Sequence, residues 1–219
     1  MKTHTAIERE IIDELLARRS DLAPCVPALE ALHRALVACY DAGAKLLVCG
    51  NGGSHADSVH IVGELMKSYE RRRPLPDAMA RALEGLPWGE ELAAHLEGGL
   101  PAIALGCSGA LKTAVENDSP LRDIAFAQEV CALAKPGDVF LGISTSGNAV
   151  NVLMAMSTAK AAGCKTAALT GPHGGKLAIH ADIAIKAPGA SPKVIQEAHL
   201  CLYHTVCGLI EAHYFPESR

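Results

Sequence analysis

The chain has 219 residues, of which 49% are hydrophobic, and its 20 basic and 24 acidic residues give a net charge of −4. This length and hydrophobic content suit a single globular domain. The slightly acidic balance would not attract nucleic acid, so we expect a small-molecule partner. No apolar run approaches 18 residues and no secretory signal is visible, which predicts a cytoplasmic protein without a membrane segment.

Two amphipathic helices are expected before the first strand. Residues 5–20 carry an apolar stripe that includes Ile7, Ile11 and Leu15, and residues 27–42 form a second helix before Gly43. An apolar stripe outside the main core needs a partner, and another subunit is a natural one. We therefore expect the helices within 1–43 to mediate oligomerisation.

Residues 44–215 alternate between short apolar runs and helical patterns. The apolar runs lie at 46–49, 101–106, 139–144, 165–171 and 182–188. Helical patterns such as 119–134 and 149–162 separate most of them, and a last helix spans about 192–213. This alternation predicts a three-layer α/β/α sandwich with a five-stranded parallel sheet, as in flavodoxin-like folds. Prolines and glycines at about 76–100 predict an insertion with a short helix at 77–83.

The first chemically informative stretch follows the run at 46–49. There Gly50, Asn51, Gly52, Gly53 and Ser54 stand directly before an amphipathic pattern. A strand, a glycine turn and a helix start in this order form an anion site, because the first N–H groups of a helix lack helical acceptors.

A second such junction lies at residues 143–149. The strand runs into Ser144, Thr145 and Ser146, followed by Gly147 and Asn148, and then a helix. All such turns lie at the carboxyl ends of parallel strands, where open α/β sheets bind ligands. Neutral hydroxyl and amide donors without a lysine suit a phosphate monoester. Because neither GxGxxG after a strand nor GxxxxGK[ST] occurs, a sugar phosphate is favoured over a nucleotide.

Together these motifs resemble the sugar isomerase (SIS) domain. They are GNGGS at 50–54, STSGN at 144–148, LTG at 169–171 and QEAH at 196–199. The HxxxE pattern at 60–64 and the QExH pattern in the last helix are similar to those of phosphoheptose isomerases, which convert sedoheptulose 7-phosphate to D-glycero-D-manno-heptose 7-phosphate. The resemblance covers most of residues 1–70 and 101–215, and it implies an aldose–ketose isomerase that assembles as a homotetramer.

The resemblance also implies roles for individual residues. Glu64 would be the catalytic base and His204 the acid. The residues that would bind the substrate are Asn51, Gly52, Gly53, Ser54, Asp118, Ser144, Thr145, Ser146, Asn148 and Gln196. Family members can bind zinc, and the matching ligands would be His60, Glu64, Gln196 and His204.

The helical spacing agrees with this assignment. His60 and Glu64 are four residues apart, or about 40° around a helix, and Gln196 and His204 are eight apart, or about 80°. Each pair can therefore face one site. A single His/Glu pair is more often a solvated helix pair, but its position after a glycine anion turn favours function. Tyr203 remains open between site lining and packing.

Three departures from the family pattern leave the substrate open to another ketose phosphate. They are Ala149 where the phosphate turn commonly has serine, Lys193 where an acidic residue often stands, and the insertion at about 76–100. SIS domains also occur as non-catalytic sugar-phosphate sensors and as a scaffold that binds the replication initiator protein. Retention of Glu64 and His204 favours an enzyme.

Overall fold

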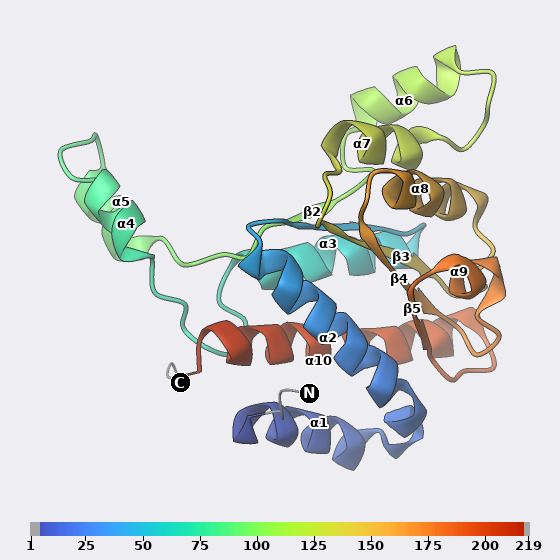
Figure 1. Ribbon diagram of the computed structural model, residues 1–219, viewed down its shortest axis with the longest axis horizontal. Coiled ribbons are helices and arrows are strands. Elements are labelled where there is room, and N and C mark those ends of the chain that lie inside the picture. Colours follow the sequence, from blue (N-terminus) through green and yellow to red (C-terminus); the bar gives the residue numbers. More distant parts are fainter. Residues whose placement is uncertain (1–4, 217–219) are drawn as a thin grey trace.

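The computed structural model describes residues 5–216, and its centre is a five-stranded parallel sheet (Figure 1). The strands are β1 Leu46–Cys49, β2 Ala102–Ala104, β3 Val139–Ser144, β4 Lys165–Thr170 and β5 Ile183–Lys186. All five fall within the apolar runs of the sequence, so the predicted sheet is confirmed. These runs are apolar throughout because helices cover both faces of the sheet.

The strands lie in the order β2-β1-β3-β4-β5. The chain moves from β1 outwards to β2, returns past β1 to β3, and then continues in the opposite direction. This is the flavodoxin-like order, whose switch point lies between β1 and β3. The two glycine turns at 50–54 and 144–148 follow these two strands, so they meet where such sheets bind ligands.

Helices form a layer on each face of the sheet (Figure 1). One layer contains α2 Val26–Asp41, α3 Gly53–Met66 and α10 Pro192–Tyr214, and the other contains α7 Ala125–Leu133, α8 Val150–Ala161 and α9 Gly175–His180. The alternation of side chains along β1 connects the layers. Leu46 and Val48 pack with the first layer, while Leu47 and Cys49 pack with the second.

The N-terminal helix α1 Ala6–Arg18 lies against α10, outside the first layer (Figure 1). Its buried residues Ile12 and Leu15 belong to the same core as Leu32 and Leu36 of α2. The predicted helices are therefore confirmed. Their apolar stripes are covered within the chain, however, so they do not by themselves require a second subunit.

One helical stretch, Ser20–Asp41, is long and apolar enough to cross a membrane by length and composition, which differs from the expectation of no such run. It consists of a 3-10 helix, Ser20–Cys25, followed by α2. Within α2, Leu29, Leu32 and Leu36 are at most 2% exposed in the core. Burial against the sheet and α10 accounts for its apolar composition.

Two helices differ from the sequence prediction in the region between β2 and β3. The predicted helix at 119–134 begins only at Ala125, because Pro120 and the left-handed backbone of Asp123 (φ 66°) interrupt it. A separate helix, α6 Gly109–Asp118, precedes this break and is capped by the side chain of Ser108. Elsewhere, between β4 and β5, the short helix α9 was not predicted from the sequence.

The insertion forms an arm, defined here as residues 76–97, that projects away from the sheet and its helices (Figure 1). It contains the predicted helix α4 Asp77–Ala82 and a second helix, α5 Gly89–His95, that the glycine-rich sequence did not predict. Trp88 is 74% exposed at the start of α5, and Met79 and Leu86 are also exposed. The arm thus presents large apolar side chains to its surroundings.

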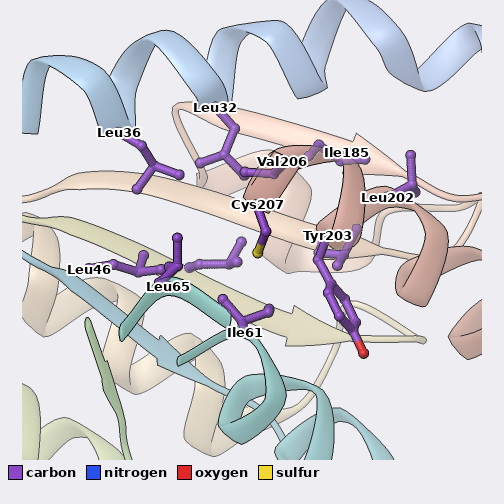
Figure 2. Close-up of a pocket in the computed structure, with 12 residues that line it drawn as sticks. Leu32, Leu36, Leu46, Ile61, Leu65, Ile185, Leu202, Tyr203, Val206 and Cys207 are labelled. Carbon is purple, nitrogen blue, oxygen red and sulfur yellow. The ribbon is translucent and has the colours of Figure 1, made fainter. Parts of the chain in front are cut away.

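A small cavity of about 20 Å³ lies inside the first core layer (Figure 2). Its lining is apolar and includes Leu36, Leu65 and Val206, and the hydroxyl of Tyr203 points away from it. A cavity of this size could hold about one water, but it offers no polar partners to retain it. It is a packing defect of the core and not a ligand site.

Candidate active site

The first site element is the turn between β1 and α3. Gly52 has a left-handed backbone (φ 56°), and a Cβ on Gly50 would lie 2.5 Å from the carbonyl oxygen of Ser54. The N–H of Ser54 donates to the carbonyl of Asn51 at 3.0 Å, which closes the turn. The helix starts at Gly53 without a side-chain cap, and helix N-termini of this kind are places where anions can bind.

The second element is the turn after β3. Gly147 has φ 66°, and any Cβ there would collide with the carbonyl oxygen of Gly174, so only glycine fits. Its N–H donates to the carbonyl of Ser144 at 3.0 Å. The N–H of Asn148 donates to the Ser146 hydroxyl at 3.2 Å. The backbone N–H of Asn148 thus helps to shape the turn. The turn also brings the hydroxyls of residues 144–146 together at the end of β3.

Side-chain amides join the two turns. Asn51 and Asn151 exchange two hydrogen bonds of 2.8 Å each. Gln196 of α10 lies directly against Gly53, where a Cβ would collide with its amide. We use the name phosphate cup for residues 51–54 and 144–148, which are predicted to bind the phosphate. Sequence reasoning missed Asn151, although an asparagine in the first turn of α8 was a visible signal.

A polar cluster follows along α3, on the side that faces α10. The Nε2 atom of His60 lies 3.1 Å from Glu64 Oε1, and its Nδ1 atom lies 3.0 Å from the Tyr203 hydroxyl. That hydroxyl donates to Asp57 Oδ1 at 3.3 Å. The Tyr203 hydroxyl thus contacts His60 while the ring is buried in the core, so Tyr203 packs the core and its role in the site stays a prediction.

His204 lies beside this cluster on α10. Its ring centroid is 5.0 Å from that of His60, 4.9 Å from that of Tyr203 and 5.6 Å from that of Tyr69. Its Nε2 atom is buried without a hydrogen-bond partner among the described residues. A buried polar atom in this condition normally has a ligand or water as its partner.

The environment tunes the charge states in this cluster. Burial acts to raise the pKa of Glu64, but the hydrogen bond from Lys67 at 2.9 Å and the neighbouring His60 lower it overall. Burial and the proximity of His60 lower the pKa of His204. Burial raises the pKa of Asp57, despite the Tyr203 hydrogen bond. At neutral pH, Glu64 is thus an anion and His204 a neutral imidazole.

A buried ion pair fixes the C-terminal end of α3. The fully buried Arg73 donates to the carbonyls of Leu65 at 2.6 Å and Glu64 at 2.9 Å, and it pairs with Glu211 at 2.7 Å. Glu211 also accepts three backbone N–H groups from residues 69–71. This network satisfies the last carbonyls of α3 and holds the backbone that carries Glu64.

The cup and the Glu64/His204 pair lie at opposite ends of α3. Ser54 and Glu64 are ten residues apart on this helix, which corresponds to about 15 Å. Gln196 lies near the cup and His204 near Glu64, so α10 follows the same path. Within one chain, the predicted phosphate-binding and acid–base residues are therefore separated by most of a helix.

The predicted zinc ligands are partly assembled. His60 contacts Glu64 and stacks edge-on against His204, whose orphaned Nε2 atom is a suitable ligand atom. Gln196 is at the cup end of α10. Imidazole nitrogen and carboxylate oxygen are donors that Zn²⁺ accepts, so these residues fit the ion chemically. The ligand set stays a prediction.

The remaining predicted substrate residue, Asp118, is the last residue of α6. It is exposed, and its carboxylate accepts a hydrogen bond from the neighbouring Asn117 at 2.9 Å. No contact links it to the phosphate cup within the described residues of this chain. Its proposed position near the sugar therefore stays a prediction.

The strand order and the two glycine turns at the switch point suit a SIS-domain α/β protein, and a sequence profile of the SIS domain matches residues 90–171. A probable phosphoheptose isomerase of Thermoplasma volcanium is 39% identical over 85% of this chain and 82% of its own length. The phosphoheptose isomerase of Roseiflexus sp. is 36% identical over 95% of both chains. The chain belongs to the phosphoheptose isomerase family.

Solved structures agree with this assignment. The phosphoheptose isomerase of Neisseria gonorrhoeae is similar with a TM-score of 0.70 and 30% identity, over 91% of this chain and 94% of that one. The enzyme of Francisella tularensis gives a TM-score of 0.69 and 30% identity, over 91% and 97%. The resemblance read from the sequence motifs is confirmed.

Proposed function

We propose that this protein is an aldose–ketose isomerase that converts sedoheptulose 7-phosphate to D-glycero-D-manno-heptose 7-phosphate. Family membership supports the reaction, and the observation that carries it in this chain is the pairing of an anionic carboxylate with a neutral imidazole. Glu64 comes from α3, whose first residues belong to the phosphate cup, and His204 comes from α10, whose Gln196 lies against Gly53 of the cup. A base and a proton-transfer partner are what an enediol mechanism needs.

In this reaction Glu64 removes the proton from C1 of the ketose, and the electrons form the C1–C2 double bond of an enediol. His204 serves the two oxygens, so that O2 gains a proton and O1 loses one. Return of the proton from Glu64 to C2 completes the aldose. His60 contacts the Glu64 carboxylate and the Tyr203 hydroxyl, and the rings of His60 and Tyr203 pack edge-on against His204.

We further propose that zinc binds through His60, Glu64 and His204, with Gln196 as the fourth predicted ligand although it lies at the cup end of α10 within one chain. A bound zinc ion would polarise the substrate oxygens. The orphaned Nε2 atom of His204 supports this ligand set. Direct binding of zinc through Glu64 would compete with its role as the base. Measuring activity while zinc is added therefore distinguishes activation by zinc from inhibition.

The distance between cup and acid–base pair supports a site shared between subunits, as expected for a homotetramer. Seven bonds separate the carbonyl carbon of the substrate from its phosphorus, which amounts to about 8–9 Å when extended. The Ser54 to Glu64 path along α3 is about 15 Å. A neighbouring subunit that places its own Glu64/His204 pair beside this cup would bring the two parts of the site within the length of the substrate. Besides the predicted N-terminal helices, the arm with the exposed Trp88 offers a second surface suited to assembly.

The first experiment measures turnover of sedoheptulose 7-phosphate by the wild type, Glu64→Gln and His204→Asn. Each substitution should lower kcat by at least about 10²-fold, the lower range for general acid–base groups. Binding of the phosphate should change little because neither residue contacts the cup. Normal turnover by both variants would refute the assignment of Glu64 and His204, whereas absence of turnover by the wild type would favour a sensor or scaffold.

The second experiment tests the shared site by complementation. A Ser144→Ala/Ser146→Ala subunit and a Glu64→Gln subunit are unfolded and refolded together, and activity is compared with each variant alone. Mixed assemblies should regain activity, because some sites would combine an intact cup with an intact pair. Absence of any gain in activity, with mixed oligomers demonstrated by light scattering and tagging, would contradict a site shared between subunits.

We also propose a cytoplasmic location, which suits a phosphorylated sugar as the substrate.

A further inference from the structure

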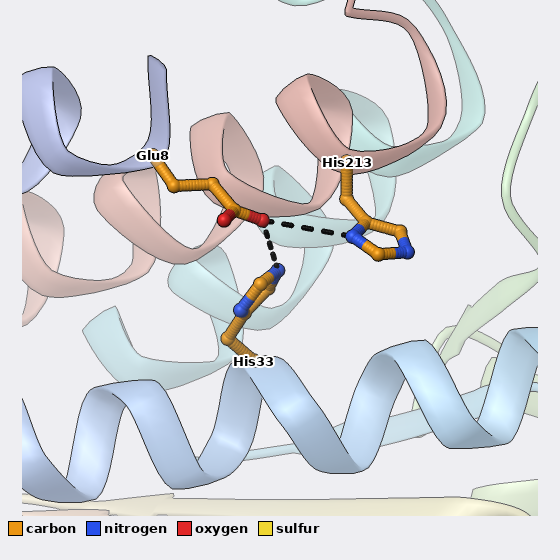
Figure 3. Close-up of side chains that lie close together, drawn as sticks. All are labelled: Glu8, His33 and His213. Atoms are coloured by element: carbon orange, nitrogen blue, oxygen red, sulfur yellow. Dashed lines mark ion pairs between the residues drawn. The ribbon is translucent and has the colours of Figure 1, made fainter. Parts of the chain in front are cut away.

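A second group of metal-ligating side chains lies away from the active site, where α1, α2 and α10 meet (Figure 3). Glu8 belongs to the first turn of α1, His33 to the middle of α2 and His213 to the last turn of α10. Glu8 and His33 are each 4% exposed, whereas the His213 side chain is 31% exposed. Two of the three side chains are thus buried, and His213 is partly exposed.

Local structure determines how each ligand atom points. Thr5 and Glu8 form a capping box, in which Glu8 Oε2 accepts from the Thr5 N–H at 2.7 Å. The other carboxylate oxygen, Glu8 Oε1, faces His33 Nε2 and His213 Nδ1 (Figure 3). The rings of His33 and His213 meet edge-on, with centroids 5.9 Å apart. One carboxylate oxygen and two imidazole nitrogens therefore converge on a common point.

The distances between the ion-paired atoms are also compatible with a shared metal ion. Glu8 Oε1 lies 3.6 Å from His33 Nε2 and 3.6 Å from His213 Nδ1. Both distances exceed the usual hydrogen-bond range of about 2.7–3.2 Å. In a tetrahedral zinc site with bonds of about 2.0–2.1 Å, neighbouring ligand atoms are about 3.3–3.4 Å apart. The two Glu8–histidine distances are within a few tenths of an ångström of this value, and the two imidazole nitrogens lie within 4.8 Å of each other.

We propose that Glu8, His33 and His213 form a structural zinc site that fastens α1 to α2 and α10. Two imidazoles and one carboxylate are a set that Zn²⁺ binds, with a fourth position reachable from solvent beside His213. The site is separate from the proposed catalytic ligands, since His213 is nine residues, or about 13 Å, beyond His204 along α10. It does not depend on the proposed isomerase activity.

The test counts metal in a full-length variant whose active-site ligands are removed, His60→Ala/His204→Asn. After removal of metal, zinc is added and measured by calorimetry and by elemental analysis. One ion per chain is expected, with the melting temperature raised by about 5–10 °C at a zinc concentration a hundredfold above the dissociation constant. Binding of no ion to this folded background would overturn the proposal.

Two further substitutions in the same background locate the ion. Glu8→Gln keeps the capping box, since glutamine serves at this position, but removes the anionic ligand. His213→Asn removes the most exposed ligand. Each should weaken zinc binding at least tenfold, while the exposed control His180→Asn should bind as the background does. Equal zinc affinity in Glu8→Gln and the control, with both folded by circular dichroism, would overturn the site.

Discussion

The buried His199 makes stability depend on pH in a defined window. Its Nε2 atom lies 3.1 Å from the carbonyl oxygen of Thr170, at the end of β4, and the side chain is fully buried. Burial lowers the pKa of His199 from 6.5 to about 4. In the folded protein the imidazole therefore stays neutral down to acidic pH, whereas in the unfolded chain it binds a proton near pH 6.5.

The sign of the effect follows from proton uptake. Between pH 6.5 and 4 the unfolded state binds more protons than the folded state, so the free energy of unfolding falls as pH falls through this window. The difference between pKa values of 6.5 and about 4 corresponds to about 3 kcal/mol of unfolding free energy, of which about 2 kcal/mol is lost by pH 5. Above pH 7 both states are neutral and this contribution to the pH dependence vanishes.

The assay is urea unfolding at pH 7.5 and pH 5.0, at one protein concentration, for wild type and His199→Gln. Glutamine cannot titrate, and its amide can still donate to Thr170. The free-energy difference between wild type and variant should shrink by about 2 kcal/mol between the two pH values. His180→Gln, an exposed histidine, should keep the wild-type dependence. Parallel curves for wild type and His199→Gln would refute the reasoning.

Two other outcomes follow from the site and its support. Ser144→Ala/Ser146→Ala should raise KM for the phosphorylated sugar by roughly tenfold or more, at about 1 kcal/mol for each neutral hydrogen bond lost, and unchanged KM would place the phosphate elsewhere. Arg73→Met should lower the free energy of unfolding by about 3–5 kcal/mol, because it leaves the buried Glu211 carboxylate without its counter-ion. Glu211→Leu should be worse, since it also orphans three backbone N–H groups; urea unfolding that ranks the two in the reverse order would contradict this account.

Local chemistry made much of the fold readable from the sequence. The five apolar runs, the glycines before α3 and α8, and the helical stripe of α1 each depend on a few neighbouring residues. The strand-to-helix junctions were sufficient to place two anion turns at the same edge of a parallel sheet. Where a break depended on backbone conformation alone, as at Asp123 between α6 and α7, the helix boundary was missed.

Tertiary structure decided the rest, because contacts between distant residues have no local signature. The Asn51–Asn151 pair spans 100 residues, and the Arg73–Glu211 pair spans 138. The convergence of Glu8 with two histidines from other helices arises only when α1, α2 and α10 pack together. The sequence by itself determined which chemical groups the site contains and at which turns they stand. Packing determined how far apart the cup and the acid–base pair lie, since that distance depends on how α3 and α10 lie against each other.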